Sequence, residues 1–309
     1  MAQADFDHDE DSLTPHSDPN SAVGSIPNAG LYIVATPIGN LGDISHRALA
    51  ILAAADLIAC EDTRVSLKLL NHYGLKRPLI SYHDHNAKMS GAKILDALAA
   101  GKRVALISDA GTPLISDPGY RLVADARAAG HKIIPIPGAC AFITALSACG
   151  LPTDKLLFLG FAPPKSSARK KFVEPYRSVD ATMVLYESPN RLPAALADFA
   201  DILGAQREAA RCRELTKRYE EIRRGSLLDL ANSTAAQEHR IKGEIVLVIA
   251  PPESERPKSD QIDDLIIKAL QDLSVREAAA AIAWMTGEKR RTIYQRALTL
   301  QGQMDDDPR

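Results

Sequence analysis

Residues 108–119 read Ser-Asp-Ala-Gly-Thr-Pro-Leu-Ile-Ser-Asp-Pro-Gly and directly follow an apolar run, Val104-Ala105-Leu106-Ile107. The apolar run indicates a buried parallel strand. Turns from strand to helix are usually only a few residues long, whereas this one is rich in glycine, proline and aspartate before a helical pattern begins near Tyr120. Such a loop can present backbone N–H and C=O groups to a ligand at the carboxyl end of a sheet, where open α/β folds bind ligands. A long structural turn is the alternative, because glycine and proline are also ordinary turn formers.

Strand and helix patterns alternate on both sides of this loop. In the first half, strands are expected at 31–36, 57–60, 104–108 and 132–137, and helices at 45–55, 64–73, 88–100 and 120–129. This βαβα series predicts a parallel sheet covered by helices. Pro137-Gly138-Ala139 then opens an apolar helix that ends at Cys149, before Gly150.

A second α/β series follows. Its strands are expected at 156–161, 182–187, 210–215 and 244–250, and its clearest helix at 191–203, with Gly204 as the stop signal. The fold class is therefore α/β with two α/β domains and a small helical C-terminal segment. The expected division is a disordered acidic tail (1–29), an N-terminal domain (30–150), a C-terminal domain (151–250), a linker (251–260), the helical segment (261–301) and a tail (302–309).

The helical segment contains recognisable signals for the start and end of helices. Helices are expected at 261–273, 276–285 and 288–300, and Ser274 with Glu277 forms a capping box for the second. A break at Thr286-Gly287 precedes the run Lys289-Arg290-Arg291. The outline is that of a helix-turn-helix that contacts nucleic acid, although helical hairpins that only pack or dimerise are commoner.

The net charge of −2 conceals a basic body. Residues 1–29 hold six acidic and no basic residues, and without both tails the body has 36 basic against 30 acidic residues. That balance permits a polyanionic partner without requiring one. The four cysteines are far apart, and neither a signal peptide nor a membrane-length apolar stretch is evident, so we expect reduced thiols and a cytoplasmic protein without a membrane partner.

Several catalytic classes lose support because their motifs are absent. The chain has no Gly-x-x-x-x-Gly-Lys-Ser/Thr, and no dinucleotide fingerprint follows its first strand, which disfavours nucleotide hydrolysis and hydride transfer. His83 and His85 alternate, so both could face one metal. Two ligands are too few, and we expect a hydrogen-bonded surface turn and no metal site.

Three Gly/Pro loops at strand ends suggest one crevice built largely from backbone. They are residues 35–43, 108–119 and 135–139, and a ligand with many polar edges would suit them. Glu61-Asp62-Thr63-Arg64 adds charge at another strand end, unless Asp62 or Thr63 is simply a helix cap.

Taken in order, these motifs resemble one family. They are Ile33 to Leu41, Cys60 to Arg64, Ser108 to Gly119, Pro137-Gly138 and Tyr186-Glu187-Ser188-Pro189-Asn190-Arg191. Together they resemble the tetrapyrrole (precorrin) methylase superfamily, in the branch that acts on ribosomal RNA. The resemblance covers roughly residues 30–300. The first loop is less glycine-rich than in the tetrapyrrole enzymes, which argues against a corrinoid or sirohaem substrate.

The resemblance implies a two-domain enzyme, usually a homodimer, that binds S-adenosylmethionine in the cleft between its domains. The implied reaction transfers a methyl group to the ribose 2′-oxygen of a cytidine in the decoding region of 16S ribosomal RNA, within the small ribosomal subunit. By resemblance the cofactor-binding residues are Asp109, Ala110, Gly111, Ser116, Pro137, Gly138, Tyr186 and Glu187. Two alternatives are a methyltransferase for a tetrapyrrole or another small molecule, and a non-catalytic RNA-binding protein.

A general base and an RNA surface complete the expectations. The candidates for the base are Asp62, His83 and Lys217, which lie near predicted strand ends, and a mechanism without a dedicated base is the alternative. Two basic runs supply the RNA candidates, which are Lys165, Arg169, Lys170, Lys171, Arg211, Arg213 and Arg218. Either run can also be an ordinary solvated face. Phosphate binding would give an affinity that falls steeply with salt.

Overall fold

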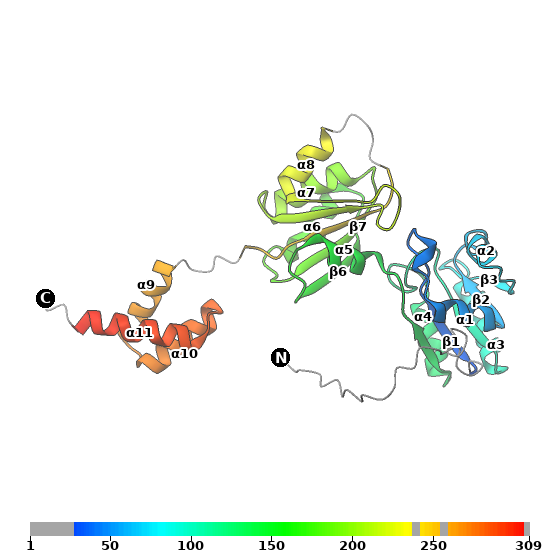
Figure 1. Ribbon diagram of the computed structural model, residues 1–309, viewed down its shortest axis with the longest axis horizontal. Helices are drawn as coiled ribbons and strands as arrows, with labels where there is room; N and C mark the ends of the chain where they lie inside the picture. The colour runs from blue at the N-terminus through cyan, green and yellow to red at the C-terminus, as the bar shows by residue number, and fades with distance from the viewer. Residues whose placement is uncertain (1–27, 237–241, 254–258, 306–309) are drawn as a thin grey trace, which may run out of the picture. The chain divides into compact units, whose positions relative to one another are not determined.

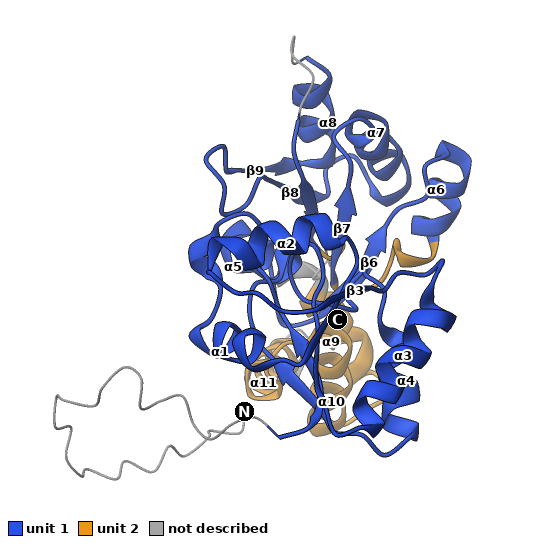
Figure 2. Ribbon diagram, turned by 90° about the vertical axis from the view of Figure 1, so that its right-hand side faces the viewer, with its two compact units in different colours: residues 1–174, 182–250 blue, residues 175–181, 251–309 orange. Residues whose placement is uncertain are grey.

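The computed structural model describes residues 28–236, 242–253 and 259–305. They form two compact units (Figure 2). The larger unit, within 1–174 and 182–250, contains both β-sheets, and the smaller one lies within 175–181 and 251–309. Most of the predicted acidic tail, half of the predicted linker and the end of the predicted C-terminal tail lie outside the described residues.

The first sheet is entirely parallel, which confirms the prediction. Its strands are β1 (Gly30–Val34), β2 (Leu57–Cys60), β3 (Leu79–Ser81), β4 (Arg103–Leu106) and β5 (Ile133–Ile136), in the order β3-β2-β4-β1-β5. The sequence did not predict β3, because three residues are too few to show a period. Since β1 lies directly beside β4, the loops that follow these two strands emerge together at the carboxyl edge.

Helices cover both faces of this sheet, as expected for a parallel sheet. They are α1 (His46–Ala54) and α2 (Thr63–His72) on one face, and α3 (Ala87–Ala99) and α4 (Tyr120–Ala128) on the other. Alternation along β1 explains the two cores: Tyr32 and Val34 pack with the first pair of helices, and Leu31 packs with the second.

The second sheet is mixed. Its strands are β6 (Leu156–Phe161), β7 (Thr182–Glu187), β8 (Glu208–Arg213), β9 (Glu221–Ser226) and β10 (Ile245–Ile249), in the order β6-β7-β10-β8-β9. Only the β6–β7 pair is parallel. The sequence did not predict β9, an edge strand of sequence Glu-Ile-Arg-Arg-Gly-Ser whose charged residues hide the pattern of a strand.

Four helices accompany the second sheet. They are α5 (Ala141–Cys149), α6 (Ser166–Val173), α7 (Leu192–Leu203) and α8 (Leu227–Ala235). Ala145, Leu146 and Cys149 of α5 pack with Val184, Ala210, Cys212, Val246 and Val248 of this sheet. The predicted domain boundary at residue 150 therefore falls one helix late, because α5 packs with the second sheet.

The C-terminal helical unit contains α9 (Ser259–Leu270), α10 (Val275–Thr286) and α11 (Arg290–Asp305) (Figure 1). Its core consists of small and branched apolar residues of the three helices, which are Ile262, Ile266, Ala279, Ile282, Ile293 and Ala297. The predicted capping box of Ser274 and Glu277 is present, and Gly287 (φ 71°) ends α10. In the part of the chain that the structure describes, no helix is long and apolar enough to cross a membrane.

Candidate functional site

The long loop after β4 is joined to the loop after β1 by backbone. Thr36 N donates to Gly111 O at 2.9 Å, and Gly111 N donates to Thr36 O at 3.1 Å. The buried Thr36 hydroxyl also donates to Ser108 O at 3.1 Å. Thr36 and Gly111, which are 75 positions apart in the chain, thus fix one edge of a site at the carboxyl ends of the strands. The sequence predicts a ligand-binding crevice at this edge of the sheet.

The long loop has an unusual backbone. Leu114 and Ser116 adopt positive φ angles of 73° and 63°, as does Gly111 at 84°. A positive φ at a non-glycine residue costs roughly 1–3 kcal/mol of backbone strain, and it is kept where the surrounding packing holds the residue in place. Leu114 supplies such packing, because it lies against the core that the first sheet forms with α3 and α4, and Ser116 lines the cavity described next.

A cavity of about 360 Å³ lies between this loop and the second sheet. That volume is within the usual range for small-ligand sites. Its walls come from both halves of the larger unit and include Ile38, Ala110, Gly111, Thr112, Ser116, Asp117, Cys140, Phe161, Tyr186, Glu187, Leu215, Gly243 and Val246. We call it the first cavity. Most of these side chains are apolar, and a few polar groups among them can orient a ligand.

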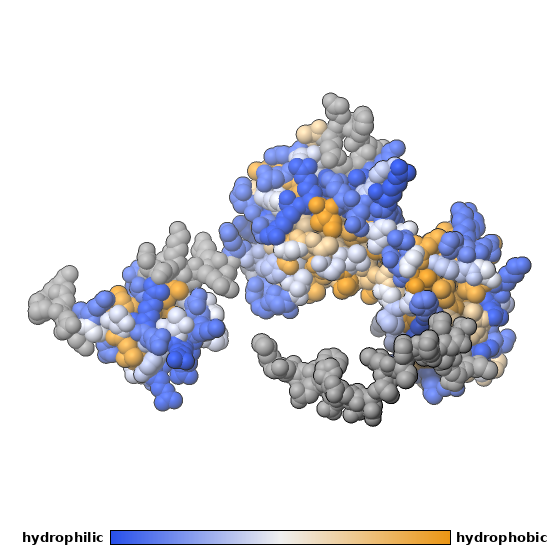
Figure 3. Space-filling view, viewed as in Figure 1, coloured by the Kyte–Doolittle hydropathy of each residue, from blue (hydrophilic) through white to orange (hydrophobic). Residues whose placement is uncertain are grey.

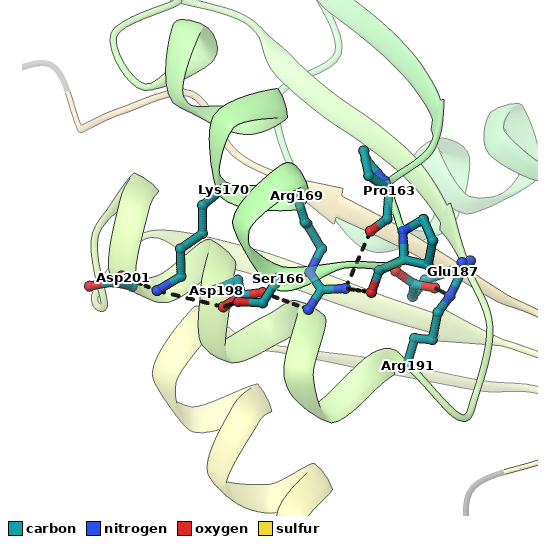
Figure 4. A network of polar contacts seen from close by, with 9 residues as sticks. Pro163, Ser166, Arg169, Lys170, Glu187, Arg191, Asp198 and Asp201 are labelled. Carbon is teal, nitrogen blue, oxygen red and sulfur yellow. Dashed lines mark hydrogen bonds and ion pairs between the residues drawn. The ribbon is translucent and has the colours of Figure 1, made fainter.

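Glu187 has an unusual position in the first cavity. The residue is only 3% exposed. Its Oε1 accepts hydrogen bonds from Ser188 N at 2.7 Å and from Arg191 Nε at 2.9 Å, and Figure 4 shows the second of these. Its Oε2 is buried and has no hydrogen-bond partner among the described residues. Because buried carboxylate oxygens are nearly always paired, this oxygen calls for a donor from a ligand.

Three carboxylates interact electrostatically, and one of them, Asp117, lines the first cavity. Burial raises the pKa of Asp117 to about 6, and Glu61 and Asp109 each raise it further through their negative charge. Burial and the charge of Asp109 raise the pKa of Glu61, and burial raises the pKa of Asp109. Carboxylates that resist ionisation in this way favour a positively charged ligand nearby.

A second cavity, of about 330 Å³, adjoins the first. It is lined by Thr36, Pro37, Ile38, Gly39, Leu41, Val65, Ser66, Lys68, Leu69, Ser108, Asp109, Ala110 and Lys217. Ile38 and Ala110 line both cavities. The two cavities therefore meet at one residue of the loop after β1, Ile38, and one residue of the loop after β4, Ala110.

The predicted cofactor-binding residues divide between these cavities. Five of them line the first cavity: Ala110, Gly111, Ser116, Tyr186 and Glu187. Asp109 lines the second cavity, and Pro137 and Gly138 line neither of the two. Gly138 has a packing role, since an added Cβ would lie 2.8 Å from Ala35 Cβ.

Sequence reasoning did not single out several lining residues. Asp117 and Thr112 lie within the quoted loop, so the loop itself was the signal, but nothing in the sequence distinguished them. Cys140 is the N-cap residue of α5 and reaches the cavity because α5 packs on the second sheet. Gly243 is also brought in by the tertiary fold, because it lies two residues before β10 begins at Ile245.

The three candidates for a general base are poorly suited to that role. Asp62 caps α2, and hydrogen bonds from Arg64 lower the pKa of Asp62 to about 2. Lys217 pairs with Glu214 and Glu244 at 2.9 Å each; burial lowers its pKa, but these bonds outweigh burial and raise it above the usual value. His83 lines neither cavity, although its buried Nδ1 has no partner among the described residues. Asp62 is thus the helix cap that the sequence offered as the alternative, whereas the ion pairs of Lys217 were not evident from the sequence.

Arg169, predicted to bind RNA, is buried instead. It is 2% exposed, and its guanidinium donates to Asp198 Oδ2 and to the carbonyl oxygens of Pro163 and Pro164 (Figure 4). The prediction for Arg169 is wrong for a physical reason: this arginine faces α7, on the inner side of α6, and joins α6 to α7. Neighbouring Lys170 is half-exposed and pairs with Asp201 at 2.7 Å.

Arg211 is a second correction. It alternates along β8 with Ala210 and Cys212, which face α5. Its fully buried side chain therefore lies on the opposite face, under α8, and contacts Thr234 (3.2 Å) and Glu221 (2.7 Å). Arg213 also pairs with Glu221. Among the RNA candidates, Lys165, Lys171 and Arg218 are exposed and stay available to phosphate.

The histidine pair does not extend into a metal site. The rings of His83 and His85 lie 5.9 Å apart between centroids. Within residues 28–236, 242–253 and 259–305, no three His, Cys, Asp or Glu side chains are grouped to hold a metal ion.

Comparisons with known proteins agree on the family. A family described as "Tetrapyrrole (Corrin/Porphyrin) Methylases" matches residues 30–231, and one described as "RsmI C-terminal HTH domain" matches residues 256–301. The ribosomal RNA small subunit methyltransferase I of Mesorhizobium japonicum is 49% identical over 88% of this chain and 92% of that protein. Its counterpart in Pseudomonas aeruginosa is 43% identical over 88% and 98%.

Solved structures show the same fold at low identity. A cobalt precorrin-4 methyltransferase superposes with a TM-score of 0.53 at 17% identity, over 71% of this chain and 94% of that one. A diphthine synthase gives 0.55 at 16% identity, over 71% and 89%. With a family match over most of the larger unit and close relatives along nearly the whole chain, the chain belongs to the tetrapyrrole methylase family and, within it, to the family of ribosomal RNA small subunit methyltransferase I.

Proposed function

We propose that this chain is an S-adenosylmethionine-dependent methyltransferase that methylates the ribose 2′-oxygen of a cytidine in the decoding region of 16S ribosomal RNA. One observation carries the proposal most strongly: the two cavities meet at Ile38 and Ala110. A methyl donor in the first cavity and a methyl acceptor in the second would face one another there. Family membership supplies the class of reaction.

The first cavity fits the cofactor chemically. S-adenosylmethionine carries an electrophilic methyl group on a sulfonium, together with an ammonium group and an adenine amino group. The unpaired Glu187 Oε2 offers a buried acceptor for one of its N–H donors. The carboxylates of Asp117, Glu61 and Asp109 favour its positive charge. Backbone groups of Ala110 and Gly111 provide the wall without bulky side chains.

The RNA is held by more than the second cavity. Lys68 lines that cavity, while Lys165, Lys171 and Arg218 are exposed elsewhere on the larger unit. We assign phosphate contacts to these residues, with an affinity that falls as salt rises. An RNA substrate in the small ribosomal subunit also implies a cytoplasmic location. A homodimer, expected from the resemblance, stays a prediction for sedimentation analysis.

Alignment should dominate the catalysis. Holding donor and acceptor in line supplies roughly 7–11 kcal/mol, whereas a general base contributes roughly 3–5 kcal/mol. Ile38 and Ala110 between the cavities, and the Thr36–Gly111 bridge behind them, fix that alignment.

Transfer of a labelled methyl group tests the proposal. The full chain is incubated with labelled S-adenosylmethionine and with small ribosomal subunits that lack the modification, and the labelled nucleotide is mapped. Label at the 2′-oxygen of one cytidine is expected. Cofactor binding without label on the RNA would overturn the assignment of RNA as the substrate and favour a small-molecule methyl acceptor. Failure to bind the cofactor would overturn the enzyme assignment and favour a non-catalytic RNA-binding protein.

A further inference from the structure

The C-terminal helical unit exposes an aromatic side chain beside a group of cations. Trp284 near the end of α10 is 87% exposed, and the adjacent Met285 is 60% exposed. Only the turn around Gly287 separates them from Lys289-Arg290-Arg291 at the start of α11. All three cations are exposed, and none forms an ion pair with any residue that the structure describes.

The fold of this unit does not require these side chains. Its core is formed by other residues, such as Ile282 and Ile293, and Trp284 is not part of it. Cations in the first turn of a helix are disfavoured by the positive end of the helix dipole. Arg290 and Arg291 lie in that first turn. By contrast, Arg296, further along the same helix, pairs with Asp263 and so does contribute to the packing.

Charge and shape indicate the partner. Indole rings stack on unpaired bases, while lysine and arginine neutralise phosphates. The deep, narrow major groove of an RNA duplex does not admit a helix, so RNA is read mostly through unpaired bases and backbone. On its visible face the unit is mainly hydrophilic (Figure 3), which fits a charged partner better than an apolar protein surface. We propose that Trp284, Met285, Lys289, Arg290 and Arg291 form a surface that binds an unpaired segment of the RNA substrate.

This inference rests on the proposed function, because it takes RNA to be the substrate. The chain offers a direct probe: Trp284 is the only tryptophan in the sequence. Intrinsic tryptophan fluorescence of the full-length chain therefore reports on this surface alone. A 20-nucleotide single-stranded oligocytidylate, with filter binding as an independent measure, serves as the ligand.

Saturable quenching of the tryptophan emission is expected, at the same RNA concentrations as filter binding. Replacing Lys289, Arg290 and Arg291 by glutamine should reduce the slope of log affinity against log salt by up to about 2. Trp284→Ala should weaken binding of small ribosomal subunits roughly 5- to 150-fold, the range for loss of one stacked base, and raise KM without lowering kcat. Leu273→Ala, which removes another exposed apolar side chain of this unit, is the matched control and should leave both values unchanged.

Two results would overturn the inference. One is an emission that stays constant while filter binding saturates. The other is a Trp284→Ala variant that binds RNA normally but loses a dimer seen by sedimentation, which would make the surface a self-association contact. Methyl transfer is measured in parallel on the same protein. Methylation with unchanged emission refutes the surface alone, and quenching without methylation on any subunit refutes the proposed reaction alone.

Discussion

Thr36 and Gly111 exchange two backbone hydrogen bonds, of 2.9 Å and 3.1 Å, although they belong to loops that follow different strands. Their bridge fixes the wall between the two cavities, since Ile38 and Ala110 flank it and line both. The bridge needs a glycine at position 111, because φ is 84° and an added Cβ would lie 3.2 Å from Ile38 Cγ2.

Gly111→Leu should abolish detectable cofactor binding, with an affinity loss of at least about 100-fold, because it combines a strained φ with a side chain inside the first cavity. Isothermal titration calorimetry measures the loss. Gly74→Ala is the matched control: its φ is 68° and nothing lies within 4 Å of the added Cβ, so it introduces similar backbone strain away from the site. Tight cofactor binding by a folded Gly111→Leu variant would contradict the assignment of the first cavity.

Glu187→Gln should weaken S-adenosylmethionine binding roughly 10- to 150-fold, as expected when a hydrogen bond to a buried charge is lost. The change keeps the shape of the side chain but removes its charge and therefore tests the unpaired Oε2. Comparing S-adenosylmethionine with S-adenosylhomocysteine identifies the contact. If the binding of both ligands weakens equally, Glu187 contacts an amino group that the two ligands share. If only the binding of S-adenosylmethionine weakens, Glu187 contacts its sulfonium. Glu208→Gln, at an exposed ion pair with Arg224, is the control.

Asp117 predicts a pH dependence of stability. Its pKa is about 6 in the folded protein against an ordinary value of 3.8, so the native state binds this proton more tightly than the unfolded chain does. Stability should therefore fall as pH rises from about 4 to about 6 and stay level above that. Asp117→Asn should remove this decrease in stability. Without ligand, the variant should be up to about 3 kcal/mol more stable than the wild-type protein at pH 7.

Chemical denaturation between pH 2 and pH 7 measures this difference. Asp56 provides a control of opposite sign, because hydrogen bonds from Arg103 lower its pKa to about 2. Its contribution is present at neutral pH and is lost as pH falls toward 2. An Asp117→Asn gain of equal size at pH 4 and pH 7 would show that titration of this carboxyl is not the cause.

Asp62→Ala should keep turnover within roughly tenfold of wild type, whereas removing a general base usually lowers rates about 10²–10⁴-fold. The reason is that Asp62 caps α2 and pairs with Arg64. The variant should unfold at a lower temperature, since the cap is lost. Initial rates at saturating cofactor decide the point, and a loss of a thousandfold in a folded variant would restore Asp62 as the base.

Arg169→Ala should destabilise the protein by about 3–5 kcal/mol, because it leaves Asp198 without its buried partner. The Asp198 carboxylate is 2.5 Å from the guanidinium, and side-chain exposures are 2% for Arg169 and 10% for Asp198. Urea denaturation measures the loss, and Arg169→Met with Asp198→Asn should recover part of it. Lys171→Ala on the exposed side of α6 is the control: it should leave stability unchanged and weaken RNA binding. If Arg169→Ala folds normally and weakens RNA binding instead, the burial argument is wrong.

The sequence by itself determined the elements and the position of the main loop. Apolar runs bounded by glycine and proline predict most strands, since burial and turn formation act over a few residues. The capping box of Ser274 and Glu277 and the stop at Gly287 are likewise local, and the structure has them where the sequence predicts them. The long loop was recognisable because its composition is unsuited to either strand or helix.

Only the tertiary structure decided which side chains share a space. Arg169 and Lys171 are equivalent in a sequence of basic residues, but helix periodicity buries the first against Asp198 and exposes the second. Lys217 lines the second cavity because its loop packs on Gly39, whose added Cβ would collide with the lysine side chain. Burial, pairing and pKa depend on the neighbours that distant segments bring together, and a linear pattern of residues does not contain those neighbours.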